Sequence, residues 1–156
     1  METVDYDQLL DLAISIAHQA HAGQLDKAGH PYIDHPLAVM AQVDTLAAKI
    51  VAVLHDAVED SDLTIEQLVS QGFPATVTDS IAAITKIEGE SYEEYLERVM
   101  SDPLALQVKV ADMTHNLDLT RIAKPTAKDF ARTEKYQEVI KRLKAALDWH
   151  LGRSMY

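Results

Sequence analysis

Apolar residues recur along most of this chain at the three- and four-residue spacing of an α-helix. The clearest stripe lies between Tyr6 and Ala22, and its members are Leu9, Leu10, Ala13, Ile14, Ala17 and Ala20. Strand and hairpin patterns do not occur over any comparable length. The one short alternation, at 108–110, sits inside a longer helical pattern. The periodicity therefore predicts an all-α fold, a compact helical bundle.

Glycine, proline and helix-capping residues divide the apolar stripes into separate segments. Gly23 ends the first helix, and the stretch 23–36 holds two Gly and two Pro, which is typical of an ordered loop. Ser91 and Glu94 have the spacing of a capping box. The helices expected after the first are 36–46, 47–59, 65–70, 75–86, 92–100, 103–122 and a last one that begins after Thr126 or Thr133 and ends near Gly152.

Length and composition narrow the class of protein. The 156 residues fit one domain, which we expect to span 1–156. Lys and Arg number 14 against 25 Asp and Glu, a formal net charge of −11 that disfavours binding to nucleic acid. The absence of cysteine excludes disulfides, zinc–thiolate sites and thiol nucleophiles. Neither a signal peptide nor an apolar run of about 18 residues occurs, so we expect a cytoplasmic protein without membrane contact.

The segment VAVLHDAVED, residues 51–60, is the most informative stretch for chemistry. An apolar run is followed at once by His55 and Asp56, and then by Glu59 and Asp60. On one continuous helix, His55 would lie one turn from Glu59 and Asp56 one turn from Asp60. Carboxylates this close repel one another, and a helix C-terminus adds to the cost. A divalent cation would relieve both penalties, whereas the alternative is a solvated acidic helix end.

A second polar cluster occurs in KVADMTHN, residues 109–116, where Lys109, Asp112 and Asn116 follow one another at roughly one-turn spacing. Because its neighbours are apolar, Asp112 is expected to point inward and to need a partner. His35, at the end of the 23–36 loop, would join the residues of both clusters in a mixed imidazole and carboxylate site. Such a site suits manganese, iron or zinc better than calcium. The four candidate ligands are His35, His55, Asp56 and Asp112.

The remaining histidines and aromatic residues are expected to be mainly structural. Trp149, which belongs to the last helix, is expected to lie in the core. Tyr92 and Tyr95 are expected to pack against the bundle, although an aromatic ring near Lys86 would also suit the border of a base pocket. For His115, a structural role is a better explanation than contact with a substrate.

Three motifs in this order, HPLAVM, VAVLHDAVED and VKVADMTHN, resemble those of the HD-domain metal phosphohydrolases. Within that superfamily, the loop GQLDKAGHPYIDHP and the segment ITKIEGESYEEYLERV are similar to the hydrolase domain of RelA/SpoT-type proteins. Small stand-alone relatives of those proteins hydrolyse guanosine tetra- and pentaphosphate. The resemblance covers about residues 7–145. It implies an HD-domain helical fold and a (p)ppGpp 3′-pyrophosphohydrolase, which yields GDP or GTP and pyrophosphate.

The resemblance also implies a role for each motif residue. The four candidate ligands would bind one divalent metal, usually Mn²⁺. Glu59 and Asp60 match the pair that acts on the attacking water. Asn116 matches a residue that contacts the substrate near the scissile ester. The lysines that match basic positions facing the phosphates are Lys27, Lys109 and Lys86.

Two positions depart from the alarmone-hydrolase pattern and keep other substrates open. Asp26 stands where an arginine usually packs against the guanine base, and Asp118 stands where a basic residue is common. One alternative is therefore an HD phosphohydrolase that acts on another nucleotide or on a phosphomonoester. Another is a non-catalytic metal- or nucleotide-binding sensor module, which the Glu59–Asp60 pair disfavours. The expected partner is a small nucleotide, and the sequence does not determine the oligomeric state.

Overall fold

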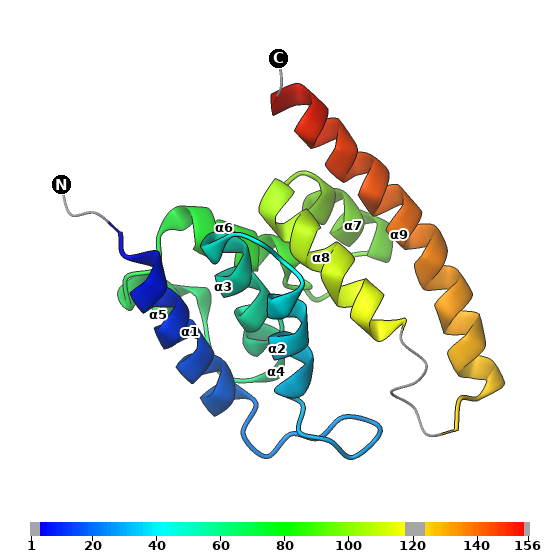
Figure 1. Cartoon of the computed structure of the whole chain (residues 1–156), viewed down its shortest axis with the longest axis horizontal. Coiled ribbons are helices and arrows are strands. Elements are labelled where there is room, and N and C mark those ends of the chain that lie inside the picture. The colour runs from blue at the N-terminus through cyan, green and yellow to red at the C-terminus, as the bar shows by residue number, and fades with distance from the viewer. Residues whose placement is uncertain (1–3, 118–123, 155–156) are drawn as a thin grey trace.

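The computed structural model describes residues 4–117 and 124–154, and within these ranges all regular elements are α-helices, as the periodicity predicts (Figure 1). Asp118 lies outside the described residues. The helices are α1 (Tyr6–Ala20), α2 (Asp34–Ala41), α3 (Leu46–Leu54), α4 (Ala57–Asp60), α5 (Ile65–Ser70), α6 (Ala75–Ile84), α7 (Tyr92–Met100), α8 (Pro103–Asn116) and α9 (Ala127–Ser154).

Helix α3 lies at the centre of the bundle and packs against α1, α2, α6 and α8. Its residues 50–54 are fully buried, as expected for a helix that is apolar on every side. Helix α8 is the second central element, since it contacts α2, α3, α6, α7 and α9. No helix in the described ranges combines the length and the apolar character needed to cross a membrane.

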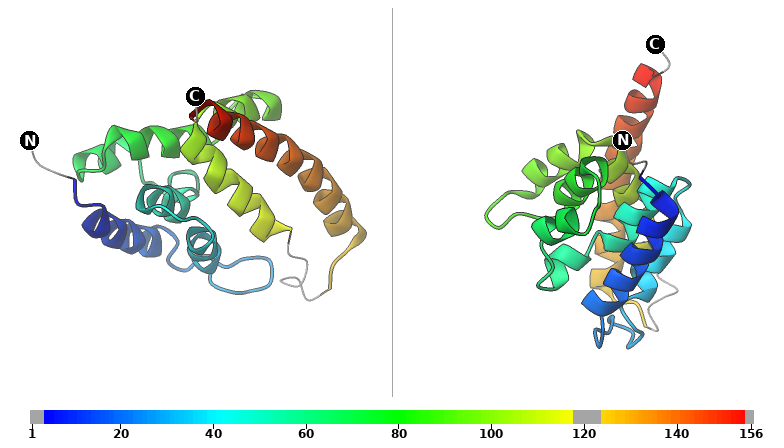
Figure 2. Two further views of the ribbon diagram at one scale, coloured as in Figure 1. Left: turned by 45° about the horizontal axis from the view of Figure 1, so that its top comes forward. Right: turned by 90° about the vertical axis from the view of Figure 1, so that its left-hand side faces the viewer.

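Two clusters of buried side chains form the core, and α8 contributes to both. One face of α8 packs into the larger cluster, which gathers side chains from α1 to α6. Another face carries Leu106 and Met113 into a smaller cluster with residues of α7 and α9. Figures 1 and 2 show α9 lying along this side of the bundle and extending beyond it at its C-terminal end.

The position expected for Trp149 is wrong, because 56% of this residue is exposed. The core-facing stripe of α9 consists of Val139, Ile140 and Leu143, and it continues through partly buried neighbours. Trp149 falls off this stripe, and its ring meets the edge of the His150 ring at 5.1 Å. His150 in turn bonds through Nε2 to the carbonyl oxygen of Met100 at 2.7 Å.

The continuous helix expected over 47–59 is also wrong, since α3 ends at Leu54 and α4 begins at Ala57. The His55 backbone N–H bonds to the Ala52 carbonyl three residues back, and the His55 ring Nδ1 bonds to the same oxygen at 2.5 Å. A side chain that competes for helical carbonyls in this way ends the regular ladder. His55 and Asp56 therefore occupy a turn rather than a helix face.

Most of the other expected boundaries hold within a few residues. Helix α5 spans 65–70 as expected, and Thr64 caps it with a capping box. Ser91 and Glu94 form the expected capping box of α7. The Thr126 hydroxyl accepts the backbone N–H of Asp129 at the start of α9, so the earlier of the two expected starts is right. The expected end of the 103–122 helix lies outside the described residues.

The loop between α1 and α2 is held by its own hydrogen bonds. Leu25 and Pro31 form an isolated β-bridge, and Gly23 and Gly29 adopt positive φ values of 79° and 84° that favour glycine. The Asp26 carboxylate accepts the backbone N–H groups of Ala28 and His30, each at 2.9 Å. Asp26 therefore stabilises the conformation of the α1–α2 loop through these two hydrogen bonds.

Arg98 of α7 ties the segment after α6 to the bundle. Its guanidinium donates to the carbonyl oxygens of Ala83 and Thr85, at 3.2 and 2.7 Å. It also donates to both carboxylate oxygens of Glu90 at 2.9 Å. This segment includes Lys86, so the anchor also positions part of the pocket described below.

We expect Arg98→Ala to lower the free energy of unfolding by about 2–3 kcal/mol, because it removes a charge-assisted pair and leaves half-buried carbonyls unpaired. Urea unfolding followed by circular dichroism measures the change. Arg142→Ala is the matched control, since Arg142 makes a bidentate pair with Glu93 on the exposed surface. An equal loss in the two variants would contradict the anchoring role of Arg98.

Candidate metal centre

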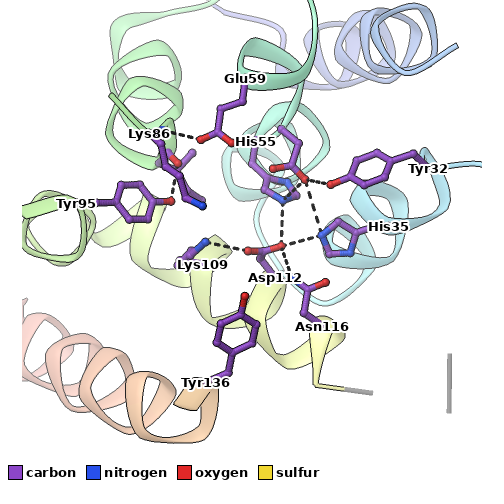
Figure 3. A pocket seen from close by; sticks show the side chains of 12 residues that line it. Tyr32, His35, His55, Glu59, Lys86, Tyr95, Lys109, Asp112, Asn116 and Tyr136 are labelled. Atoms are coloured by element: carbon purple, nitrogen blue, oxygen red, sulfur yellow. Dashed lines mark hydrogen bonds and ion pairs between the residues drawn. The ribbon is translucent and has the colours of Figure 1, made fainter. Parts of the chain in front are cut away.

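Four titratable side chains from three separate segments meet where α2, α3 and α8 pack together (Figure 3). His35 lies in the first turn of α2, His55 and Asp56 in the turn after α3, and Asp112 on α8. Each offers one ligand atom, and these atoms all lie within 4.8 Å of one another. The structure therefore brings together the four residues that the sequence singles out as candidate ligands.

The imidazoles and carboxylates of the cluster are in direct contact. His35 Nε2 lies 2.7 Å from Asp112 Oδ1, and His55 Nε2 lies 3.2 Å from the same oxygen. His55 Nε2 also lies 3.0 Å from Asp56 Oδ2. Both Nε2 atoms point at the two carboxylates, so the cluster presents two nitrogen and two oxygen donors to one point. This donor set suits a divalent transition metal.

Each member of the cluster also has a partner outside it, which orients its ligand atom. His35 Nδ1 lies 2.6 Å from His115 Nδ1, and the two rings stack at 4.9 Å. His55 Nδ1 bonds to the Ala52 carbonyl, which directs Nε2 inward. The outer partners of the carboxylates, with their distances, are Tyr32 Oη to Asp56 Oδ2 at 2.6 Å, Lys109 Nζ to Asp112 Oδ2 at 3.1 Å and Asn116 Nδ2 to Asp112 Oδ1 at 3.3 Å.

Burial and charge together set the protonation of the cluster. Burial by itself would lower the pKa of His55, but the carboxylates of Asp56 and Asp112 outweigh it and hold that pKa well above its ordinary value. Burial would raise the pKa of Asp56, but His55 outweighs it and lowers the pKa to about 2. Asp112 is also buried, yet Lys109 and the two histidines hold its pKa well below the ordinary value. Without a metal, the His55 proton therefore supplies positive charge between two ionised carboxylates.

Glu59 and Asp60, the pair expected to act on water, take different positions on α4. Glu59 lines the same pocket as the cluster, and its Oε1 accepts the backbone N–H of Lys86 at 2.6 Å. Asp60 is not among the residues that line this pocket, and its backbone carbonyl accepts Gln24 Nε2 at 3.0 Å. Burial and the nearby Asp56 raise the pKa of the Asp60 carboxyl.

The cluster lies in a cavity of about 140 Å³, which Lys86, Lys109 and Asn116 also line. A second cavity of about 120 Å³ shares these three residues and reaches α7 and α9. The structure does not bring Lys27 into the lining of either cavity, and this lysine is exposed on the α1–α2 loop.

The cavity linings include two residues of α9 that the sequence does not mark, and also Tyr92 and Tyr95, for which the sequence analysis weighs the border of a base pocket. Tyr136 of α9 lines both cavities, and Lys135 lines the second, where its Nζ lies 5.4 Å from the centre of the Tyr92 ring. Tyr95 lines the first cavity, with Lys109 Nζ 5.3 Å from its ring centre. The sequence gives no signal for Lys135 and Tyr136, since helical periodicity does not tell which face α9 turns to α8.

The raised pKa of His55 predicts the direction of a pH dependence. In metal-free protein, this group stabilises the fold fully below about pH 6.5, the ordinary histidine value. As the pH rises further, the unfolded chain loses the proton before the folded one does, so the free energy of unfolding falls. Urea unfolding between pH 6 and 9, with EDTA present, measures this fall.

His55→Gln removes the group and should flatten this dependence, whereas His18→Gln, on the exposed surface of α1, should keep it. If the free energy of unfolding of the wild-type protein changed between pH 6 and 9 by the same amount as that of His55→Gln, the assignment would be contradicted.

Comparison with known proteins assigns the chain to a family. A family model described as HD domain matches residues 13–145. A probable GTP pyrophosphokinase of Mycobacterium leprae is 34% identical over 161 residues, covering 92% of this chain and 20% of that protein. The guanosine-3′,5′-bis(diphosphate) 3′-pyrophosphohydrolase of Haemophilus influenzae is 32% identical over 117 residues, covering 65% of this chain and 17% of that protein. The bifunctional (p)ppGpp synthase/hydrolase SpoT of Escherichia coli is 30% identical over 131 residues, covering 72% and 18%.

The chain thus spans at most a fifth of the length of these relatives. A solved structure, described as that of a metazoan orthologue of SpoT that hydrolyses ppGpp, has a TM-score of 0.71 and 22% identity to this chain. The match covers 94% of this chain and 88% of that one, so the two share a fold along nearly their whole lengths. The family match includes all three motifs and the four clustered residues. The chain belongs to the HD domain family.

Proposed function

We propose that this protein is a divalent-metal-dependent phosphohydrolase that removes pyrophosphate from the 3′ position of (p)ppGpp. The observation that carries the proposal is the cluster of two histidines and two aspartates in a cavity that Glu59 and two lysines also line. The activities for which the H. influenzae and E. coli relatives are named support the choice of substrate. The chain spans less than a fifth of the length of each of these relatives.

In this proposal His35, His55, Asp56 and Asp112 hold one divalent ion, which we expect to be Mn²⁺. The chemistry of the donor set supports it, because two imidazole nitrogens and two carboxylate oxygens suit a transition metal. The crowding of two ionised carboxylates supports it as well, since their repulsion calls for a positive charge between them. An ion bound there would lower the pKa of a water in contact with it and polarise a phosphoryl oxygen.

We assign to Glu59 the role of accepting a proton from the attacking water. Its Oε1 is held by the Lys86 N–H, which leaves Oε2 as the acceptor. General-base help from a fixed carboxylate contributes about 10²–10⁴-fold to a rate. Asp60 is the second member of the pair, and its raised pKa makes it a better proton acceptor than an ordinary aspartate. Asp60 is exposed on α4 next to Glu59 in the sequence, and we propose that it passes the proton on to solvent.

The substrate phosphates are proposed to lie along Lys109 and Lys86, with Asn116 near the scissile ester. Developing negative charge on a leaving pyrophosphate needs nearby cations. The Nζ atoms of Lys109 and Lys86 lie 5.3 and 5.9 Å from the centre of the Tyr95 ring, so two positive groups share one wall. The contact of Lys27 with phosphate stays a prediction.

A second candidate substrate, another nucleotide or a phosphomonoester, is favoured by one observation. The Asp26 carboxylate accepts two N–H groups of its own loop, so this position does not supply a cation for stacking on a guanine base. The metal cluster and Glu59 would serve either substrate. The sensor-module alternative predicts metal binding without turnover.

We propose that residues 1–156 act as one domain, since α8 contributes to both core clusters. The nucleotide partner follows from the proposed substrate. The cytoplasmic location and the exclusion of nucleic acid stay predictions from the sequence.

Metal binding is expected to stabilise the fold. After EDTA treatment, adding Mn²⁺ to 100 times its Kd should stabilise the protein by about 2.7 kcal/mol, which raises the melting temperature by roughly 5–10 °C. Asp112→Ala should abolish this shift, whereas Asp11→Ala, on the exposed surface of α1, should keep it. Differential scanning calorimetry measures both, and an Asp112→Ala variant with a full shift would contradict the site.

Mn²⁺-loaded protein is expected to convert ppGpp to GDP and pyrophosphate. Glu59→Gln should reduce this rate about 10²–10⁴-fold while Mn²⁺ uptake is unchanged. Glu66→Gln, on the exposed surface of α5, is the control with the same chemical change. Anion-exchange chromatography of the products measures the reaction.

The same assay distinguishes the alternatives when it includes GTP and p-nitrophenyl phosphate. If the protein hydrolyses GTP or p-nitrophenyl phosphate but releases no pyrophosphate from ppGpp, the proposed substrate is wrong and the second candidate substrate class is favoured. Full Mn²⁺ binding without turnover of any of the three would favour the sensor module.

A further inference from the structure

Tyr32 stands out among the residues around the cluster because neither the sequence motifs nor the proposed function gives it a role. It lies just before α2, and its hydroxyl donates to Asp56 Oδ2 at 2.6 Å (Figure 3). Its ring lies between two histidine rings, with centroid distances of 5.0 Å to His21 and 5.9 Å to His35. A phenol with an ordinary pKa near 10 keeps its proton at neutral pH, so the hydroxyl acts as the donor.

Asp56 is the member of the cluster that most needs such a partner. It lies in the turn between α3 and α4, and its side chain is 18% exposed, against 8% for Asp112. Asp112 is anchored from α8 by Lys109 and by Asn116. Among the described residues, Tyr32 is the one hydrogen-bond partner of the Asp56 carboxylate that is not itself a candidate ligand.

Tyr32 itself is held in place by the loop and by α4. Its backbone N–H donates to the Gln24 carbonyl at 2.8 Å. The Gln24 side chain donates to the carbonyls of Ala20 and Asp60, at 3.1 and 3.0 Å. Gln24 thus connects the end of α1, the loop that carries Tyr32 and the end of α4, the helix that follows Asp56. The donor and the acceptor of the Tyr32–Asp56 bond are therefore fixed relative to each other.

We infer that Tyr32 is a positioning residue for the metal centre, and that its hydroxyl holds the Asp56 carboxylate in the orientation that presents it to the ion. This inference rests on the proposed metal site but not on the proposed substrate. An ionised carboxylate offers about four lone-pair sites, so the bond from Tyr32 leaves room for an ion. Removing such an outer partner of a metal ligand typically weakens metal affinity about 10–100-fold.

The test is titration of the metal-free 156-residue chain with Mn²⁺ in a calorimeter. Tyr32→Phe keeps the ring and removes the hydroxyl, and it should raise the Kd for Mn²⁺ about 10–100-fold. Tyr6→Phe removes a hydroxyl from α1 away from the pocket lining and should leave the Kd unchanged. A role confined to loop packing would lower the melting temperature of the metal-free protein and leave the Kd alone. A Kd for Tyr32→Phe within twofold of the wild-type value would overturn the inference.

A double-mutant cycle tests whether the effect passes through Asp56. In an Asp56→Ala background, which removes the acceptor of the Tyr32 hydroxyl, Tyr32→Phe should cause no further loss of Mn²⁺ affinity. An equal additional loss in that background would show that Tyr32 acts by another route and would overturn the inference. Wild-type protein that takes up no Mn²⁺, Fe²⁺ or Zn²⁺ would overturn the metal centre itself, and the inference with it. Metal binding that depends on Tyr32 without ppGpp hydrolysis would contradict only the proposed substrate.

Discussion

The buried carboxylate of Asp112 is the group on which the rest of the structure depends. The Asp112 residue as a whole is 5% exposed. Its carboxylate contacts His35 from α2, His55 from the turn after α3 and Lys109 from its own helix. Taking an ionised carboxylate out of water is costly unless cations and donors surround it. Its partners must therefore converge from segments far apart in the sequence, and α2, α3 and α8 are held in the arrangement that creates the pocket. Fold and site share this one interaction.

The distribution of charge around the pocket differs from that of the chain as a whole. The net charge of −11 belongs to a surface rich in carboxylates. By contrast, two cations that line the cavity lie near the Tyr95 ring, with the Nζ atoms of Lys86 and Lys109 at 5.9 and 5.3 Å from the ring centre. A small phosphate-bearing molecule would find positive charge along this wall, whereas a nucleic acid would meet the acidic exterior. The local arrangement is what makes the proposed substrate compatible with an acidic protein.

The all-α class, most helix bounds and the four clustered residues could be predicted from the sequence, because each depends on spacing along one helix or on a motif. The break at His55 and Asp56 could not, since it results from a ring that bonds backward to Ala52 and sideways to Asp112. The periodicity therefore predicts a continuous helix where the structure has a turn. Trp149 was placed wrongly for a similar reason, because the core-facing stripe of a long helix depends on where its neighbour ends.

The sequence by itself determined which residues carry chemistry and which segments are helical, since periodicity, caps and short motifs act within a few residues. Only the tertiary structure decided how these parts meet. The bonds from Tyr32 to Asp56, from His55 to Asp112 and from His35 to His115 join residues 24, 57 and 80 positions apart. The tertiary structure also decided that α9 brings Tyr136 to the pocket. Such contacts depend on the packing of whole helices around buried charge, and no local pattern encodes that packing.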